Sequence, residues 1–371
     1  MTTVKDIVSK FENFAPQQLA EKGDPVGLQL GDLNHPVHKM LVTLDVRPET
    51  VQEAIAKQVD FIFAHHPMMF HPIHSFDLSS PQNQMYAELI KHNITVYAAH
   101  TNLDNANGGM NDWLAECLGL VDCEPLLGPQ AEKIYKLAVF VPETAAKRLR
   151  TGLAHAGAGQ VGNYSSCSFS QAGTGRFLPE QDAQPYIGTT GRLEEAAEEK
   201  VEVIFPARKK AQVLSAMYAN HPYEQIVFDL YPIEGMGDSY GMGRVGQLEK
   251  PQTLSDFIEL CKNALKIPAL RVVTDDLEQT VQRVALLGGS GAKFYPDAIT
   301  KKADVYVTGD VSYHTAHDML ANKLNVIDPG HHFEWVCQPR LQELFTRWAK
   351  EEDWQLTVMA TELNTDPFMF V

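Results

Sequence analysis

Short apolar runs that stop at polar breaks are the main pattern along this chain. Runs of this length, bounded by Pro or Gly, are typical of strands buried on both faces of a sheet. Because open α/β sheets bind ligands beyond the ends of their strands, the residues that follow these runs are where we expect a functional site. The runs cover residues 61–64, 94–99 and 326–327, and they lead into His65-His66-Pro67, His100-Thr101-Asn102-Leu103-Asp104 and Asp328-Pro329-Gly330-His331.

The residues at these strand ends suggest a metal centre. Imidazole and carboxylate groups together form a ligand set suited to Zn, Fe, Mn or Ni. His331 and Glu334 stand three residues apart at an expected helix start, so they share one face. The alternative is structural, because an isolated His at a strand end more often makes an ordinary hydrogen bond, and the chain has 14 histidines. The combination of His, Asp and Glu at three strand ends favours the metal site.

Two distant segments repeat one order of elements. Residues 41–66 and 284–310 each contain a strand, a polar or glycine-rich break, a helix and a second strand. The match indicates a duplicated α/β unit with two pseudo-equivalent halves. We expect the metal to lie between the halves.

The middle of the chain differs in pattern. Residues 136–246 predict a strand at 137–142, a helix at 145–156, further short strands around 200–205, a helix at 209–219 and a last strand at 226–230. The order β-α-β-β-α-β is that of a ferredoxin-like unit. We therefore predict an inserted α+β domain.

Length, charge and cysteine content limit the class of protein. A chain of 371 residues exceeds the usual size of one domain. The formal net charge of −16 argues against bulk nucleic-acid binding or binding to an anionic membrane through a basic face. The five cysteines are odd in number and form no C-x-x-C pair, which predicts a reducing, cytoplasmic setting.

The N-terminus reads as an amphipathic helix rather than a charged leader with an apolar centre. No apolar run approaches the roughly 18 residues that a membrane-spanning helix needs. We expect no membrane partner.

Other motifs carry weaker predictions. The turn Gly288-Gly289-Ser290-Gly291 lies between a strand and a helix, so it is either a tight turn lining the cleft or an anion site. Tyr313, His314 and Asp318 favour a capped helix over a proton shuttle. Covalent catalysis is disfavoured because no G-x-S-x-G elbow and no obvious nucleophilic Cys occur.

Taken together, the motifs resemble those of the GTP cyclohydrolase 1 type 2 homolog family, the Nif3-like proteins with a dinuclear metal centre. The resemblance covers nearly the whole chain, and the middle segment is similar to the inserted CutA/PII-like domain of the longer members. The matching segments are 24–29, 64–67, 100–104, 288–291, 308–310 and 328–334 in the outer parts, and 157–177 and 221–224 in the middle.

The resemblance implies a duplicated Nif3-like α/β core interrupted by a ferredoxin-like α+β domain. The core occupies residues 1–127 and 246–371, and the insert occupies 128–245. Two divalent ions per chain (Zn, Fe or Mn) are implied, with Glu334 as our choice for the carboxylate that bridges them. A second His follows His331 and leaves open which imidazole binds. The implied metal ligands are His65, His66, Asp104, His331 and Glu334.

Two functions are consistent with this family. One is a metal-dependent hydrolase acting on a small molecule, with GTP cyclohydrolase chemistry or phosphoester hydrolysis as candidate reactions. The other is a non-catalytic assembly for metal storage, insertion or sensing, whose insert responds to a small-molecule effector. For either one the resemblance implies a homo-oligomer, a hexamer built as a trimer of dimers.

Overall fold

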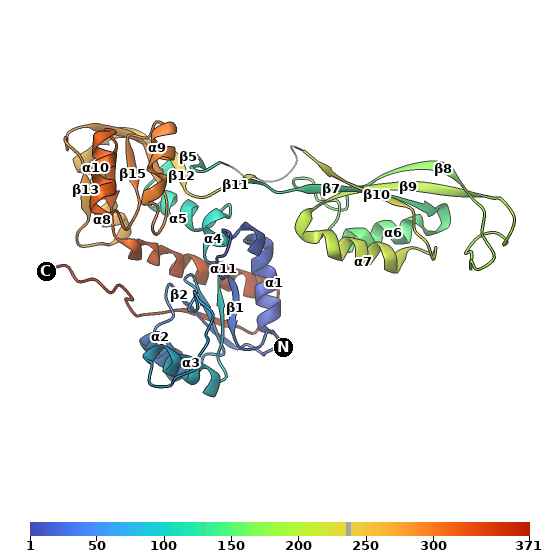
Figure 1. Ribbon diagram of the computed structural model, residues 1–371, viewed down its shortest axis with the longest axis horizontal. Coiled ribbons are helices and arrows are strands. Elements are labelled where there is room, and N and C mark those ends of the chain that lie inside the picture. The colour runs from blue at the N-terminus through green and yellow to red at the C-terminus, as the bar shows by residue number, and fades with distance from the viewer. Residues whose placement is uncertain (129, 235–238) are drawn as a thin grey trace. The chain divides into compact units, whose positions relative to one another are not determined.

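The computed structural model describes residues 1–128, 130–234 and 239–371, and it confirms a mixed α/β fold. The chain forms two compact units (Figure 1). The first combines Met1–Pro129 with Tyr240–Val371, and the second is Gln130–Ser239.

The first half of the first unit is built on a five-stranded sheet in the order β1-β4-β3-β2-β17. Strands β2, β3, β4 and β17 are parallel, and β1 pairs with β4 in the antiparallel sense. The sheet thus has the parallel core that buried, Val- and Phe-rich runs predict. Its elements are α1 (Val4–Phe14), η1 (Gln17–Leu19), β1 (Gly27–Leu30), β2 (Lys39–Thr43), α2 (Pro48–Lys57), β3 (Phe61–Ala64), α3 (Pro81–Lys91), β4 (Thr95–Ala98) and β17 (Thr357–Ala360).

The second half of this unit is built on a six-stranded sheet in the order β13-β16-β15-β14-β12-β5. Its central strands β14, β15 and β16 are parallel, and β13 pairs with β16 in the antiparallel sense. Its elements are β5 (Leu120–Pro125), β12 (Arg244–Thr253), α8 (Leu254–Leu265), β13 (Arg271–Val273), β14 (Thr280–Leu286), η3 (Ala292–Phe294), α9 (Tyr295–Thr300), β15 (Val305–Val307), α10 (Tyr313–Ala321) and β16 (Asn325–Asp328).

The two halves repeat one topology, as the sequence predicted. The order α1-β1-β2-α2-β3-α3-β4 matches α8-β13-β14-α9-β15-α10-β16, including the antiparallel edge strand in each sheet. Even the first helix starts alike in both. The Thr3 side chain accepts a hydrogen bond from the Asp6 amide, and the Thr253 side chain accepts one from the Asp256 amide, which caps α1 and α8.

One hydrophobic core joins the two halves. It contains side chains of both sheets together with those of α1, α5 (Met110–Cys117), α8 and α11 (Cys337–Glu351). Helix α1 buries Val4, Ile7, Val8 and Phe11, the spacing of a single helix face, which confirms the amphipathic helix expected there. The ring of Phe11 lies 4.7 Å from that of Phe63 on β3. This shared core fixes the strand ends of one half against those of the other.

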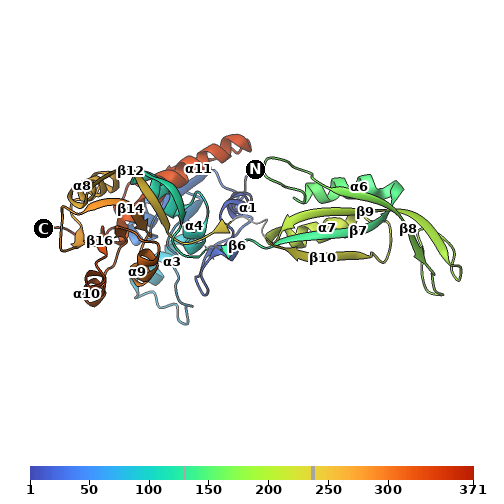
Figure 2. The ribbon, with the colours of Figure 1, turned by 90° about the horizontal axis from the view of Figure 1, so that it is seen from above.

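The second unit is a four-stranded antiparallel sheet in the order β10-β7-β9-β8, and the element order is β-α-β-β-α-β. Helices α6 and α7 pack on one face, against a core that includes Leu137, Val139, Val201 and Val203 (Figure 2). The elements are β7 (Ile134–Pro142), α6 (Glu143–His155), β8 (Phe169–Phe177), β9 (Glu194–Pro206), η2 (Ala207–Lys209), α7 (Lys210–Asn220) and β10 (Phe228–Ile233), with β6 (Gln130–Ala131) and β11 (Ser239–Tyr240) paired at its ends.

The strands of the central hairpin are longer than the sequence predicted. The expected short strands around 200–205 form part of β9, which runs over 13 residues and pairs with β8 from Glu194 to Glu202. Glycines in β8 and adjacent glutamates in β9 interrupt the alternation of apolar and polar residues, so the sequence did not indicate the full length of either strand.

The boundary after the second unit lies near residue 239, whereas the sequence suggested 245. Arg244 is buried in the first unit, where its guanidinium donates to the Asp112 carboxylate and to the carbonyls of Gly241 and Ala106.

All five cysteines are free. In the described part of the chain, none of the helices has the length and apolar character required to cross a membrane.

Candidate metal centre

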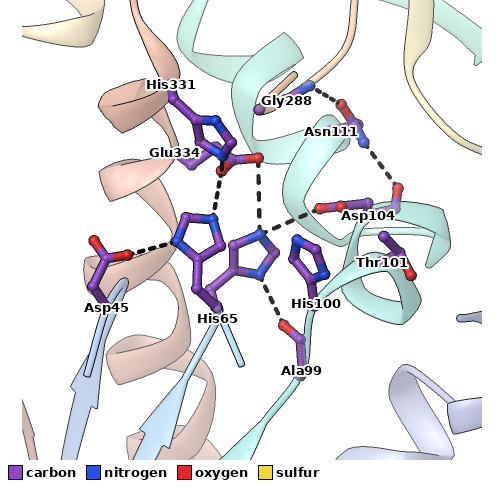
Figure 3. A network of polar contacts seen from close by, with 12 residues as sticks. Asp45, His65, Ala99, His100, Thr101, Asp104, Asn111, Gly288, His331 and Glu334 are labelled. Atoms are coloured by element: carbon purple, nitrogen blue, oxygen red, sulfur yellow. Dashed lines mark hydrogen bonds and ion pairs between the residues drawn. The ribbon is translucent and has the colours of Figure 1, made fainter. Parts of the chain in front are cut away.

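Strand ends from both halves of the first unit converge on one cluster of His, Asp and Glu (Figure 3). All five residues that the sequence singled out lie in it. His65 and His66 directly follow β3, Asp104 lies in α4 (Thr101–Asn105) after β4, and His331 and Glu334 lie in η4 (His331–Val336) after β16. The expected helix at Glu334 is thus a 3₁₀ helix, in which residues three apart align.

Glu334 lies at the centre of the cluster and is 2% exposed. Its Oε1 atom is 3.8 Å from His65 Nε2, while its Oε2 atom is 3.1 Å from His66 Nε2 and 3.3 Å from His331 Nε2. Potential ligand atoms of His65, Asp104 and Glu334 all lie within 4.8 Å of one another, and so do those of His66, His331 and Glu334. The two oxygens of one carboxylate therefore face two different sets of donors.

Two polar atoms in the first of these sets lack partners. Among the described residues, His65 Nε2 and Asp104 Oδ1 are buried and accept or donate no hydrogen bond. They are 3.6 Å apart, which is too long for a hydrogen bond. Burying such groups unpaired costs about 1–3 kcal/mol each. A divalent cation between them would satisfy both, so the residues present fit a metal ion.

The Nδ1 atoms of His65, His66 and His331 each take part in a hydrogen bond. Hydrogen bonds at Nδ1 fix the ring orientation and aim Nε2 at the centre, as is usual for metal-binding His. The bonds join His65 to the Ala99 carbonyl at 2.8 Å, His66 to Asp45 Oδ1 at 2.8 Å, and His331 to Asp310 Oδ2 at 2.7 Å.

His100 is a further cluster member that the sequence analysis did not include among the ligands. Its ring centroid is 5.3 Å from that of His65 and 5.5 Å from that of His66, and these three residues form a third group of potential ligands. Its Nδ1 atom is 2.9 Å from Asp24 Oδ1, so Nε2 is its remaining donor atom. Its position at the end of β4 was a signal for it, because the neighbouring strand end carries the His pair.

Hydrogen bonds and burial strongly shift the pKa values of the cluster residues. Burial lowers the pKa of His66, but hydrogen bonds to Asp45 and Glu334 outweigh burial and raise it to about 10. The hydrogen bond to Glu334 raises the pKa of His331 to about 9. Burial raises the pKa of Asp104 to about 6. A metal ion at this site would compete with protons for the imidazole nitrogens.

The glycine turn after β14 lines the cluster. A Cβ atom on Gly288 would lie 2.8 Å from Glu334 Oε1, and one on Gly289 would lie 3.0 Å from the same oxygen. Gly289 also has a φ of +61°, which favours glycine. Buried Asn111 accepts a hydrogen bond from the Gly288 amide and donates one to the Asp104 carbonyl, each 2.9 Å long. The turn therefore lines the cluster, as one of the two interpretations of this segment expects.

The sequence left open which of two adjacent histidines, His331 or His332, is the ligand. His331 is the imidazole placed against Glu334, whereas His332 belongs to none of the three groups of potential ligands. Burial lowers the pKa of His332.

At α10, the Ser312 side chain accepts a hydrogen bond from the Thr315 amide, which confirms the capped helix expected around Tyr313.

Known proteins with similar sequences extend over the full chain. A protein from Halalkalibacterium halodurans named GTP cyclohydrolase 1 type 2 homolog is 42% identical over 365 residues, which cover 98% of each chain. A protein of the same name from Bacillus subtilis is 41% identical over 367 residues, covering 99% of this chain and 98% of that protein.

Solved structures and a family profile agree with these matches. A Bacillus cereus protein related to NIF3 superposes with a TM-score of 0.89 at 42% identity, covering 100% of this chain and 99% of that one. A Staphylococcus aureus protein superposes with a TM-score of 0.78 at 30% identity, with the same coverage. The profile of Duf34/NIF3 (NGG1p interacting factor 3) matches residues 2–367. The chain therefore belongs to the Duf34/NIF3 family.

Proposed function

We propose that this protein binds two divalent metal ions and is a metal-dependent hydrolase of a small molecule. The observation that carries the proposal is Glu334, whose two carboxylate oxygens face separate donor sets. His65 and Asp104 would hold one ion, His66 and His331 would hold the other, and the Glu334 carboxylate would contribute to both. Zn, Fe and Mn all suit this ligand set.

The bound ions would supply an activated water nucleophile and a clamp for a substrate oxygen. The chain itself orients the site. Asp45 and Asp310 hold His66 and His331 in the tautomer that presents Nε2. His100 faces the same centre and is held by Asp24, so we assign it either a further ligand position or proton transfer at Nε2.

Metal analysis of two variants tests the bridge. Glu334→Ala removes the carboxylate that offsets the repulsion between two ions, so it should lower bound metal by about two ions per chain or leave one held weakly. His331→Ala removes a terminal ligand and should cost about one ion. Both variants are dialysed side by side with the wild type. Equal losses of one ion would make Glu334 a terminal ligand and contradict the bridge.

Turnover is tested separately on metal-loaded protein. GTP cyclohydrolase chemistry predicts release of formate from GTP, which must disappear in His65→Ala and Glu334→Ala. Hydrolysis of nucleotides and phosphoesters is measured on the same samples. Metal binding without any turnover would favour the second candidate function, a metal-storing, metal-inserting or metal-sensing assembly. The separate second unit supports that candidate, because a small-molecule effector could bind there.

The wider architecture belongs to the same proposal. We infer that the segment near 128–245 is an inserted ferredoxin-like domain of the CutA/PII type, supported by its β-α-β-β-α-β order and the sheet order β10-β7-β9-β8. We also propose a hexamer of three dimers, tested by light scattering of the full chain. The five free cysteines support a reducing compartment such as the cytoplasm.

A further inference from the structure

The second unit contains a cavity of about 820 Å³. In the sequence, its lining residues are far from every residue assigned to the metal centre. Ligand pockets for small molecules are typically about 300–1,000 Å³ in volume. Side chains alternate along β9, so Val201 and Val203 face α6 and α7 while Glu198 and Lys200 face the opposite side. The cavity lies on that opposite side, where residues 178–187 and 223–227 cover the sheet.

A buried carboxylate, that of Glu198, lines this cavity. Glu198 is 8% exposed, and its Oε1 atom accepts a hydrogen bond of 2.8 Å from the Tyr223 hydroxyl. A Cβ atom on Gly175 would clash with its other oxygen, so glycine leaves room for the carboxylate in this position. Within the described ranges, Glu198 forms no ion pair, whereas the adjacent Glu199 pairs with Arg150.

Two cationic side chains line the same cavity as Glu198, but each forms an ion pair with another carboxylate. Arg176 pairs with Glu195 at 2.8 Å, and Lys200 pairs with Glu202 at 2.6 Å. Burial lowers the pKa of the neighbouring His221, whose Nε2 atom donates to the Phe140 carbonyl. The buried negative charge therefore lacks a compensating positive charge from the chain. A buried, unpaired carboxylate is costly, and a ligand cation would relieve that cost.

Aromatic rings complete the cavity. The ring of Tyr223 lies 6.1 Å from that of Phe177 and 6.2 Å from that of Tyr186, and all three line the cavity. Rings of this kind bind apolar groups by contact and cations through their π faces. A divalent metal is a poor fit, because no group of three potential ligands occurs at Glu198 among the described residues.

We propose that this cavity is a binding site for a small organic cation, an ammonium group attached to an apolar or aromatic body. The ammonium pairs with Glu198, and the body lies among Phe177, Tyr186 and Tyr223. Anions are rejected because their charge would be buried against that of Glu198.

Titration calorimetry of the full chain with a pair of matched probes tests this site. The probes are 2-phenylethylamine, which is a cation at neutral pH, and 3-phenylpropionate, which has a similar body and the opposite charge. The amine should bind saturably and at least about tenfold more tightly than the carboxylate, as expected for a charge-assisted hydrogen bond. Equal affinities, tighter binding of 3-phenylpropionate, or no saturable binding of the amine would each overturn the proposal.

Two variants assign the preference to a residue. Glu198→Gln keeps the shape and an acceptor for Tyr223 but removes the charge, so the preference for the amine should disappear. Glu199→Gln is the matched control on the neighbouring position of β9, and it should retain the preference. A preference that survives in Glu198→Gln would refute the assignment. Thermal unfolding verifies that each variant is folded, and if Glu198→Gln is not, the wild-type comparison of the two probes decides alone.

Discussion

Asp45→Asn tests whether the carboxylates behind the imidazoles determine metal affinity. Asp45 Oδ1 lies 2.8 Å from His66 Nδ1, and the Thr365 hydroxyl donates to its other oxygen at 2.5 Å. The amide of Asn retains an acceptor for His66 but removes the negative charge that makes this imidazole more basic. The change leaves all proposed ligands in place.

The size of the effect follows from the geometry. Loss of such a carboxylate typically costs 10–100-fold in metal affinity, or about 1.4–2.8 kcal/mol. Because the Asp45 side chain is 27% exposed, water screens part of the charge, and we expect the lower end, about 10–30-fold. The side chain of Asp310, which holds His331, is 45% exposed, so Asp310→Asn should cost less. Both changes should weaken the same ion, the one assigned to His66 and His331.

Competition between the metal-free protein and a chromophoric zinc chelator measures both affinities. The control is Asp60→Asn in the same half, since Asp60 accepts hydrogen bonds from the amides of His38 and Lys39 and contacts no ligand. It should bind both ions as the wild type does. Wild-type affinity in Asp45→Asn, or equal weakening of both ions, would refute the reasoning.

Three further changes test other features. Gly289→Ala places a Cβ atom 3.0 Å from Glu334 Oε1 at a positive φ, so it should lose metal and about 1–2 kcal/mol of stability in urea unfolding; wild-type behaviour would contradict the close approach. Asn111→Ala leaves two buried backbone groups unpaired, at about 1–3 kcal/mol each, and an unfolding midpoint equal to wild type would show that water replaces the side chain. Replacement of residues 130–239 by a short Gly-Ser linker should preserve metal content, because every proposed ligand lies outside this unit; joint loss of metal and fold would make it part of the core.

The residues that form the cluster could be selected from the sequence because they stand at the ends of short buried strands. Residues 61–64 are buried and apolar, and the polar His65-His66-Pro67 that follows them marks the end of the strand. The relation between 41–66 and 284–310 was also visible, since strand, break, helix and strand follow in the same order. Local sequence therefore located the site, although its members are up to 269 residues apart in the chain.

The partners of the imidazoles could not be predicted in the same way. Asp24, Asp45 and Asp310 lie in loops, where no periodicity indicates which way a side chain points. Asp310 in addition has a φ of +57°, a conformation that is uncommon outside glycine and asparagine or aspartate and that nothing in its neighbours predicts. The long pairing of β8 with β9 was missed because tertiary pairing overrides the weak strand propensity of Gly and Glu.

The division of the proposed ligands between the two halves couples metal occupancy to folding. The first half supplies His65, His66 and Asp104, and the second supplies His331 and Glu334, so each of the two proposed ion sites draws ligands from both halves. Ions that bind only the joined halves add to their mutual stability, by about 4 kcal/mol when free metal exceeds the dissociation constant a thousandfold. Chelation should then lower the unfolding temperature of both halves together. The metal centre would then act as a cross-link between the two halves.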